Sequence, residues 1–199
     1  MTHNAHATEK FSLKDDLDVL NSMMERIVSH LQTDEIYGNQ GMFVSGLPSV
    51  TLGGILLRIR RLNALRERVG KYQQVKLDEA IEKHDRVYHE WTSHYEKKLK
   101  VELQSRIERL EQFIQEYQDD PKQYMVAFEP ERTRRTIVQE ILYMMQRINQ
   151  ENNHLLTRLA NLDDNLRSIV KPSTFQWASN LESVYSKDEF WWLHSILEE

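Results

Sequence analysis

The stretch LDEAIEKHDRVYHEWTSHYEKKLKVELQSRIERLEQFIQEY, residues 77–117, decides the fold of this chain. Large, mostly apolar side chains recur in it every three or four residues, as on one face of an α-helix. This stripe runs through Leu77, Ile81, His84, Tyr88, Trp91, Tyr95, Leu99, Leu103, Ile107, Leu110, Ile114 and Tyr117. No proline interrupts residues 50–117, so we predict one long helix over 50–118, with Gly70 as its one point of interruption. The period of the stripe over 77–117 is close to 3.6 residues, which predicts a nearly straight arm on the order of 60 Å long over these residues.

A second periodic stretch follows Pro121 and Pro130 and predicts a return helix over 131–170. Its apolar residues form two lines about 100° apart around the helix. One line holds Ile137, Ile141, Met144, Ile148, Leu155, Leu159, Leu162, Leu166 and Ile169, and the other holds Val138, Leu142, Met145, Leu156 and Ala160. A single neighbour would need only one line, so we expect this helix to be wedged between two neighbours. The predicted fold is all-α, a helical bundle built on a long antiparallel helical hairpin.

Two further features precede the hairpin. Ser12 is placed to cap a first helix over 12–32, and acidic residues in its first turn favour the positive end of the helix dipole. The glycine-rich stretch 37–54 predicts a loop between the first two helices, with Ser49 or Thr51 as the cap of the next helix. We expect this loop to be ordered, because its apolar side chains need burial. They are Met42, Phe43, Val44 and Leu47.

Beyond Pro172, residues 173–198 predict a C-terminal helical segment that is rich in aromatic side chains. It is too apolar to remain in water, and it packs either on its own chain or on a second subunit. Residues 1–11 are expected to form a disordered tail, and 12–199 a single domain.

Composition excludes several classes of protein. The chain has no cysteine, so it forms neither disulfides nor thiolate metal sites. Its first residues lack the features of a signal peptide, and no apolar run reaches the ~20 residues of a membrane span. We therefore expect a cytoplasmic protein that does not enter the membrane.

Cations gather between residues 58 and 71 in a chain whose net charge is −5. The candidates for binding an anion or a partner are Arg58, Arg60, Arg61, Arg68 and Lys71. On a continuous helix, four of them fall within about 100° of one another, whereas Arg58 falls on the apolar side. The alternative is a solvated face that pairs with acidic residues. Nucleic acid is a candidate ligand that we do not favour, because no recognition motif accompanies the face.

Arg58 is predicted to lie on the buried side of its helix, where an unpaired guanidinium would be strongly unfavourable. We therefore expect a carboxylate partner from the first helix, among Asp15, Asp16 and Asp18. Replacing Arg58 by alanine should lower the stability of the fold by on the order of 3 to 5 kcal/mol, more than Arg60→Ala or Arg68→Ala.

The pair Gly53-Gly54 lies at the start of a predicted helix. It permits close packing of another backbone, or it leaves free amides that could hold an anion. We favour packing, because the pair lacks the lysine and the spacing of a phosphate-binding loop.

A run of polar residues interrupts the return helix at NQENNH, residues 149–154. We predict a polar core layer that fixes the register of the hairpin, with a ligand site as the alternative. Its members are Asn149, Glu151, Asn152 and His154. Glu151 and His154 also have a spacing that suits one metal ion, and Glu90 and His94 are the candidates to complete the site.

No motif for a nucleophile, a phosphate loop or a cofactor occurs in the chain, so the sequence names no catalytic residue and no cofactor. Our first hypothesis is a non-catalytic helical interaction or scaffold protein that forms a homodimer and binds protein partners. The alternatives are a nucleic-acid-associated regulator that uses the face 58–71, and a metal or small-ligand binding protein that uses the 149–154 layer.

Overall fold

The structure, a computed structural model, describes residues 11–37, 49–124, 127–150 and 152–198. Helices dominate it, and the all-α prediction is confirmed. The α-helices are α1 (Leu13–Gln32), α2 (Leu52–Ala64), α3 (Lys71–Glu90), α4 (Thr92–Asp119), α5 (Pro121–Tyr124), α6 (Phe128–Arg147) and α7 (Asn153–Arg167). The shorter elements are the 3-10 turns η1 (Arg66–Arg68), η3 (Ser179–Val184) and η4 (Trp191–His194), and the strands β1 (Val170–Pro172) and β2 (Ser195–Leu197).

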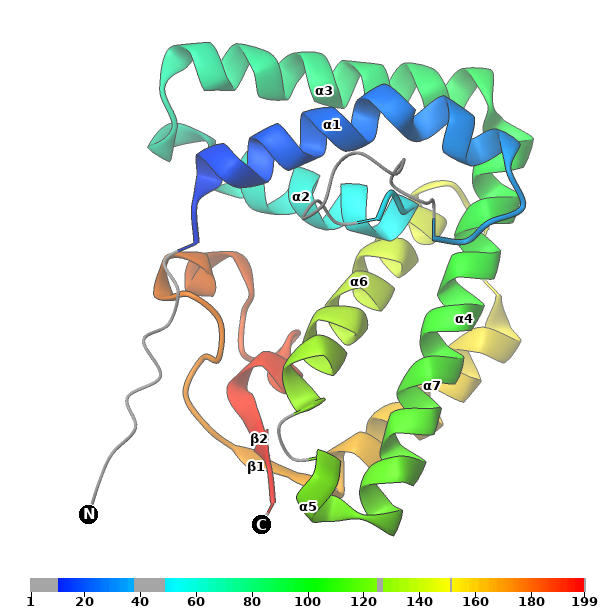
Figure 1. Cartoon of the computed structure of the whole chain (residues 1–199), viewed down its shortest axis with the longest axis vertical. Coiled ribbons are helices and arrows are strands. Elements are labelled where there is room, and N and C mark those ends of the chain that lie inside the picture. Colours follow the sequence, from blue (N-terminus) through cyan, green and yellow to red (C-terminus); the bar gives the residue numbers. More distant parts are fainter. Residues whose placement is uncertain (1–10, 38–48, 125–126, 151, 199) are drawn as a thin grey trace.

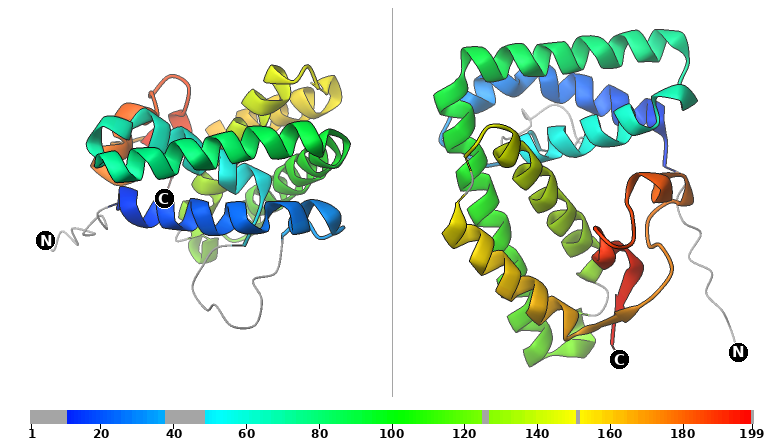
Figure 2. Two further views of the ribbon diagram at one scale, coloured as in Figure 1. Left: turned by 90° about the horizontal axis from the view of Figure 1, so that it is seen from above. Right: turned by 180° about the vertical axis from the view of Figure 1, so that it is seen from behind.

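The helices form two groups that meet at a steep angle (Figure 1). Helices α1, α2 and α3 lie side by side, and α1 contacts both of the others. Helices α4, α6 and α7 run away from this layer, and the C-terminal segment folds back against α6, as the rear view in Figure 2 also shows. No helix in the described part of the chain combines the length and the apolar character that a membrane crossing requires.

The long helix over 50–118, with its straight arm over 77–117, is a wrong prediction, because the chain turns sharply at Trp91. Next to the corner, the Thr92 hydroxyl donates to the Tyr88 carbonyl over 2.8 Å and so takes over a hydrogen bond of the helix backbone. Across the corner, the buried His84 ring bonds to the Tyr95 hydroxyl over 2.8 Å. The stripe is therefore real, but its two halves line different packing surfaces.

The interruption near Gly70 is present. Helix α2 ends at Ala64, the turn η1 follows, and α3 begins after Gly70. The side chain of Gln74 donates to the Arg66 and Val69 carbonyls and satisfies acceptors that the helix break exposes.

The return helix over 131–170 is also divided, and the continuous helix is a wrong prediction. Asn149 adopts a left-handed backbone conformation, with φ 53°, directly after α6. Asn152 then caps α7 by accepting the Leu155 amide at 3.2 Å. Asparagine suits both positions, because it tolerates positive φ and its short side chain can accept a helix N–H.

Helix α6 is the central element, and it has the two neighbours that its apolar lines predict. It packs between α4 and α2. Val138 and Ile141 are fully buried there. We expected the preceding arm as one neighbour and the first helix, the C-terminal segment or another subunit as the other. The arm is present as α4, the second large contact is with α2, and the C-terminal segment also packs on α6 through η4.

The C-terminal segment is not helical over 173–198, which corrects that prediction. It forms two 3-10 turns and the strand β2, which pairs antiparallel with β1 so that Val170 faces Leu197. Its aromatic side chains pack within the chain: Tyr185, Phe190 and Trp192 are at most 1% exposed. The Trp192 indole donates to the Thr136 hydroxyl of α6 over 2.9 Å, which ties the segment to the central helix.

The first helix occupies the predicted range and has the predicted cap, since Ser12 accepts the Asp15 amide at 3.2 Å. Most of the glycine-rich loop falls at 38–48, outside the described residues, and its ordered packing stays a prediction. The tail 1–11 also lies almost wholly outside them.

Candidate functional site

A cleft of about 880 Å³ lies where α1, α2 and α6 meet the C-terminal segment. This volume is typical of sites that hold a ligand or a short peptide segment. Its apolar and aromatic lining includes Phe11, Val19, Leu57, Ile137, Trp177 and Leu181, and its charged lining includes Asp15, Asp16, Arg58, Arg61, Arg106 and Glu129. No histidine lines it among the described residues, so none of its hydroxyl groups has a histidine base beside it there.

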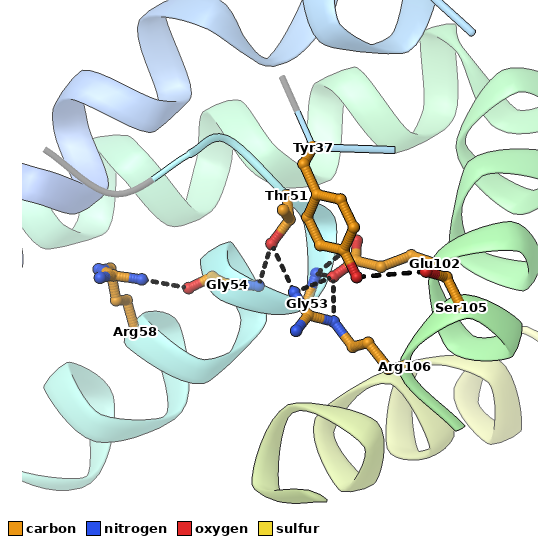
Figure 3. Close-up of polar contacts among 8 residues, drawn as sticks. All are labelled: Tyr37, Thr51, Gly53, Gly54, Arg58, Glu102, Ser105 and Arg106. Atoms are coloured by element: carbon orange, nitrogen blue, oxygen red, sulfur yellow. Dashed lines mark hydrogen bonds and ion pairs between the residues drawn. The ribbon is translucent and has the colours of Figure 1, made fainter. Parts of the chain in front are cut away.

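The floor of the cleft is built around the first turn of α2 (Figure 3). Thr51 caps this helix by accepting the Gly54 amide at 3.0 Å. The Gly53 amide points instead at Glu102 of α4, and both carboxylate oxygens accept it at 3.2 Å. A buried negative charge therefore faces the positive end of the α2 dipole, which stabilises both groups.

Glu102 forms a buried ion pair one turn along the same helix. The Arg106 guanidinium donates from Nε to Glu102 Oε1 over 2.8 Å, and also reaches the Thr51 hydroxyl at 3.2 Å. Glu102 is 0% exposed and Arg106 6%. The ring of Tyr37 covers the guanidinium at 5.5 Å. This junction joins α4 to α2 and fixes the cleft floor.

The glycine pair serves close packing. A Cβ atom on Gly53 would lie 2.3 Å from Ile137 Cγ2 and 2.9 Å from Ile141 Cδ1 of α6. The same amide does hold an anion, as the alternative interpretation required, but the anion is the carboxylate of Glu102 from the chain itself. The two interpretations therefore describe one junction.

Arg58 has the acidic partner that its position predicts. Its Nε lies 3.2 Å from Asp16 Oδ1, and Asp16 is 8% exposed. The second Asp16 oxygen is buried without a hydrogen-bond partner, and burial raises the pKa of this carboxyl although Arg58 opposes the shift. A further Arg58 nitrogen donates to the Gly54 carbonyl over 2.9 Å. The arginine therefore holds α1 against α2 at the cleft wall.

Replacing Arg58 by alanine should lower the free energy of unfolding by about 2 to 3 kcal/mol, because it leaves Asp16 buried and unpaired. The structure changes the order that we expected for the other arginines. Arg60→Ala should now cost a similar amount, since Arg60 also meets a buried carboxylate. Arg68→Ala should cost less than about 0.5 kcal/mol, since Arg68 is exposed. Urea denaturation of the three variants measures this order, and three equal losses would contradict it.

The buried carboxylate that Arg60 contacts belongs to Glu140 of α6. Glu140 is 5% exposed, and its Oε1 lies 2.6 Å from Arg60 Nε. Neither of these two atoms has a well-aligned hydrogen bond, so the contact is an ion pair without good direction. Burial raises the pKa of Glu140 to about 7, although Arg60 and Arg61 act to lower it. The cost of burying this charge outweighs the attraction.

This shift predicts a pH dependence of stability. The pKa of Glu140 is raised from its ordinary value of 4.5 to about 7, so the folded state holds the proton more tightly than the unfolded chain. The corresponding stability is fully present below pH 4.5 and is lost as the pH rises through 7, by up to about 3 kcal/mol. Between pH 5 and 7.5, wild type should therefore lose more stability than Glu140→Gln in urea titrations. Parallel pH profiles would show that Glu140 is already ionised at pH 5.

The predicted basic face does not form one surface. Arg60 contacts Glu140, Arg61 donates to the Tyr185 hydroxyl over 2.9 Å, and Arg68 donates to the Asn180 carbonyl over 3.3 Å. Lys71 begins α3 on the other side of the break. The prediction that four cations share one arc of the helix surface required a continuous helix. Because α2 ends at Ala64, these cations do not lie on one helix.

The polar core layer is a wrong prediction, because Asn149, Asn152 and His154 are exposed at the joint between α6 and α7. Glu151 lies outside the described residues. The metal candidates Glu90 and His94 fall on opposite sides of the Trp91 corner. In the part of the chain that the structure describes, no three histidine, aspartate or glutamate side chains gather to hold one ion.

Sequence reasoning missed the Glu102 and Arg106 pair, although a signal exists. Both residues fall beside Leu99, Leu103 and Ile107 at helical spacing, on the buried side of the stripe. Two opposite charges four residues apart on a buried face predict an internal ion pair. Trp177 and Tyr37 reach the cleft only through tertiary folding, and no local pattern indicates it.

In comparisons with known proteins, no family model matches this chain, and no curated protein or solved structure matches it. The functional interpretation therefore rests on the geometry of the cleft.

Proposed function

We propose that this protein is a non-catalytic interaction protein, and that its cleft binds a short segment of another polypeptide. The observation that supports this is the mixed lining of the 880 Å³ cleft, in which apolar and aromatic walls surround a few convergent polar groups. A peptide segment suits such a lining, because it offers apolar side chains together with backbone donors and acceptors.

A homodimer stays a prediction without further support. Its motivation was the double apolar line of the return helix and the aromatic C-terminal segment. Within the chain, Val138, Met145, Tyr185, Phe190 and Trp192 are buried, whereas Leu142 and Leu156 are half-buried and Ala160 is exposed. The nucleic-acid alternative also gains no support, because the cations of 58–71 do not share a surface.

Nuclear magnetic resonance of the indole N–H groups can test the proposal. The Trp177 indole donates to Glu129 at the cleft over 2.7 Å, whereas the Trp192 indole is buried against Thr136. Titration with pools of randomised nonapeptides, acetylated and amidated at their ends, should shift the Trp177 resonance and leave that of Trp192 in place.

A matched pair of variants provides the control. Thr133→Trp fills the cleft from α6 and should abolish the shift, whereas Thr157→Trp on the exposed face of α7 should not affect it. If no pool shifts Trp177 at millimolar concentration, or if Thr133→Trp binds as well as wild type, the proposal is wrong.

A further inference from the structure

The three arginines of the cleft differ in what they contact. Arg58 has Asp16 as its ion-pair partner, and Arg106 has Glu102. Arg61 has no carboxylate partner among the described residues, and its one hydrogen bond there goes to the neutral Tyr185 hydroxyl. A half-buried guanidinium at a cleft wall without an anion is an unusual arrangement, because such a group usually has a carboxylate partner when it is partly desolvated.

Aromatic rings hold Arg61 in place. The centre of its guanidinium lies 4.4 Å from the centroid of the Trp177 ring, and 5.5 Å and 5.8 Å from those of Phe11 and Tyr185. Its Nε is fixed by the 2.9 Å bond to the Tyr185 hydroxyl. The rings therefore orient the guanidinium plane, and its terminal nitrogens keep their donor capacity. A pre-oriented guanidinium loses little entropy when it binds a carboxylate through two parallel hydrogen bonds.

Among the described residues, no carboxylate that lines the cleft forms an ion pair with Arg61, although its charge acts on Asp16 from a longer distance and lowers the pKa of that carboxyl. Asp16 pairs with Arg58, and Glu129 accepts hydrogen bonds from Arg132 and Trp177. Asp15 is exposed at the start of α1. Three acids and three arginines make the formal charge of the lining neutral, so the cleft offers no net attraction to a run of negative charges such as a nucleic-acid backbone. A single carboxylate among uncharged residues fits this distribution better.

On the basis of the proposed function, we propose that Arg61 binds a carboxylate side chain of the peptide, so that the cleft selects a segment with one acidic residue among apolar ones. Trp177 and Phe11 then act twice, since they orient the guanidinium and offer an apolar surface to the residues beside the acid.

Three peptide pools test this selection. Each is a nonapeptide pool, acetylated and amidated at its ends, with Glu, Gln or Lys fixed at the fifth position and with uncharged residues elsewhere. Wild-type protein should bind the Glu pool about tenfold more tightly than the isosteric Gln pool, as one charge-assisted contact allows. The advantage of the Glu pool should decrease as salt is added, whereas binding of the Gln pool should not change.

Variants of Arg61 assign the effect to this residue. Arg61→Gln should remove the preference for Glu over Gln, measured as the ratio of the two affinities within the same variant. Arg61→Lys should keep a preference of a few fold, because a point charge lacks the planar fork. Arg68→Gln, which changes an exposed arginine outside the cleft, should behave as wild type. Melting temperatures show whether each variant is folded. If a variant does not fold, the salt dependence of peptide binding by the wild-type protein still tests the proposal.

Equal binding of the Glu and Gln pools would overturn the role of Arg61 and leave the proposed function in place. Tightest binding of the Lys pool would also overturn it, and would assign recognition to the exposed carboxylate of Asp15. If none of the three pools binds, the proposed function fails together with this inference.

Discussion

Glu102→Ala is expected to lower the free energy of unfolding by about 3 to 5 kcal/mol. Glu102 is 0% exposed, and its carboxylate accepts both the Arg106 guanidinium and the Gly53 amide. The substitution leaves a buried cation without its partner and a helix amide without an acceptor, and each is costly where water cannot enter. Urea denaturation followed by circular dichroism measures the loss.

Two further substitutions separate the contributions. Glu102→Gln keeps an acceptor for the Gly53 amide and should cost less than Glu102→Ala. Replacing both Glu102 and Arg106 by leucine removes the pair without leaving a lone charge, and should cost less than either single change to alanine. A loss below about 1 kcal/mol for Glu102→Ala would show that water reaches the pair and screens it.

The buried faces of the helices could be predicted because they depend on local periodicity. Leu99, Leu103 and Ile107 are all 0% exposed, as the stripe requires. The corner at Trp91 could not be predicted, because the stripe continues through it without a proline or glycine. A hydroxyl from Thr92 and a ring contact between His84 and Tyr95 are enough to stabilise the turn. Tertiary contacts of this size override a weak local preference.

The C-terminal segment shows the same limit. Its aromatic content correctly indicated burial, but burial does not specify helix. Tyr185, Phe190 and Trp192 pack edge to face with one another in irregular backbone, and β2 satisfies its own hydrogen bonds with β1. Neighbours that are distant in sequence decide this conformation.

Only those contacts of the candidate site could be predicted in which the helical periodicity of the sequence shows which face of one helix meets another helix. The partner of Arg58 follows from its apolar neighbours, and Asp16 of α1 occupies that position. The cleft itself combines α1, α2, α6 and Trp177 from the C-terminal segment. The shape of the cleft depends on the sharp corner at Trp91 and on the C-terminal segment folding back against α6. A single sequence reveals neither.

Gly53→Ala should cost on the order of 3 to 4 kcal/mol, because several neighbours approach the position more closely than a methyl group allows. A Cβ atom there would lie 2.3 Å from Ile137 Cγ2, 2.8 Å from Glu102 Oε1 and 2.9 Å from Ile141 Cδ1. Alanine is the better helix former, so intrinsic propensity alone would predict stabilisation by up to about 1 kcal/mol. The sign of the measured change therefore reports packing.

Gly70→Ala is the matched control for that substitution. A Cβ atom on Gly70 would approach only the end of the flexible Gln73 side chain, at 2.7 Å, and its backbone φ of −67° suits any residue. We expect a change within about 0.5 kcal/mol. Thermal and urea denaturation of both variants, under identical conditions, compare the two positions directly. If Gly53→Ala is as harmless as Gly70→Ala, then α6 and Glu102 do not press against the start of α2.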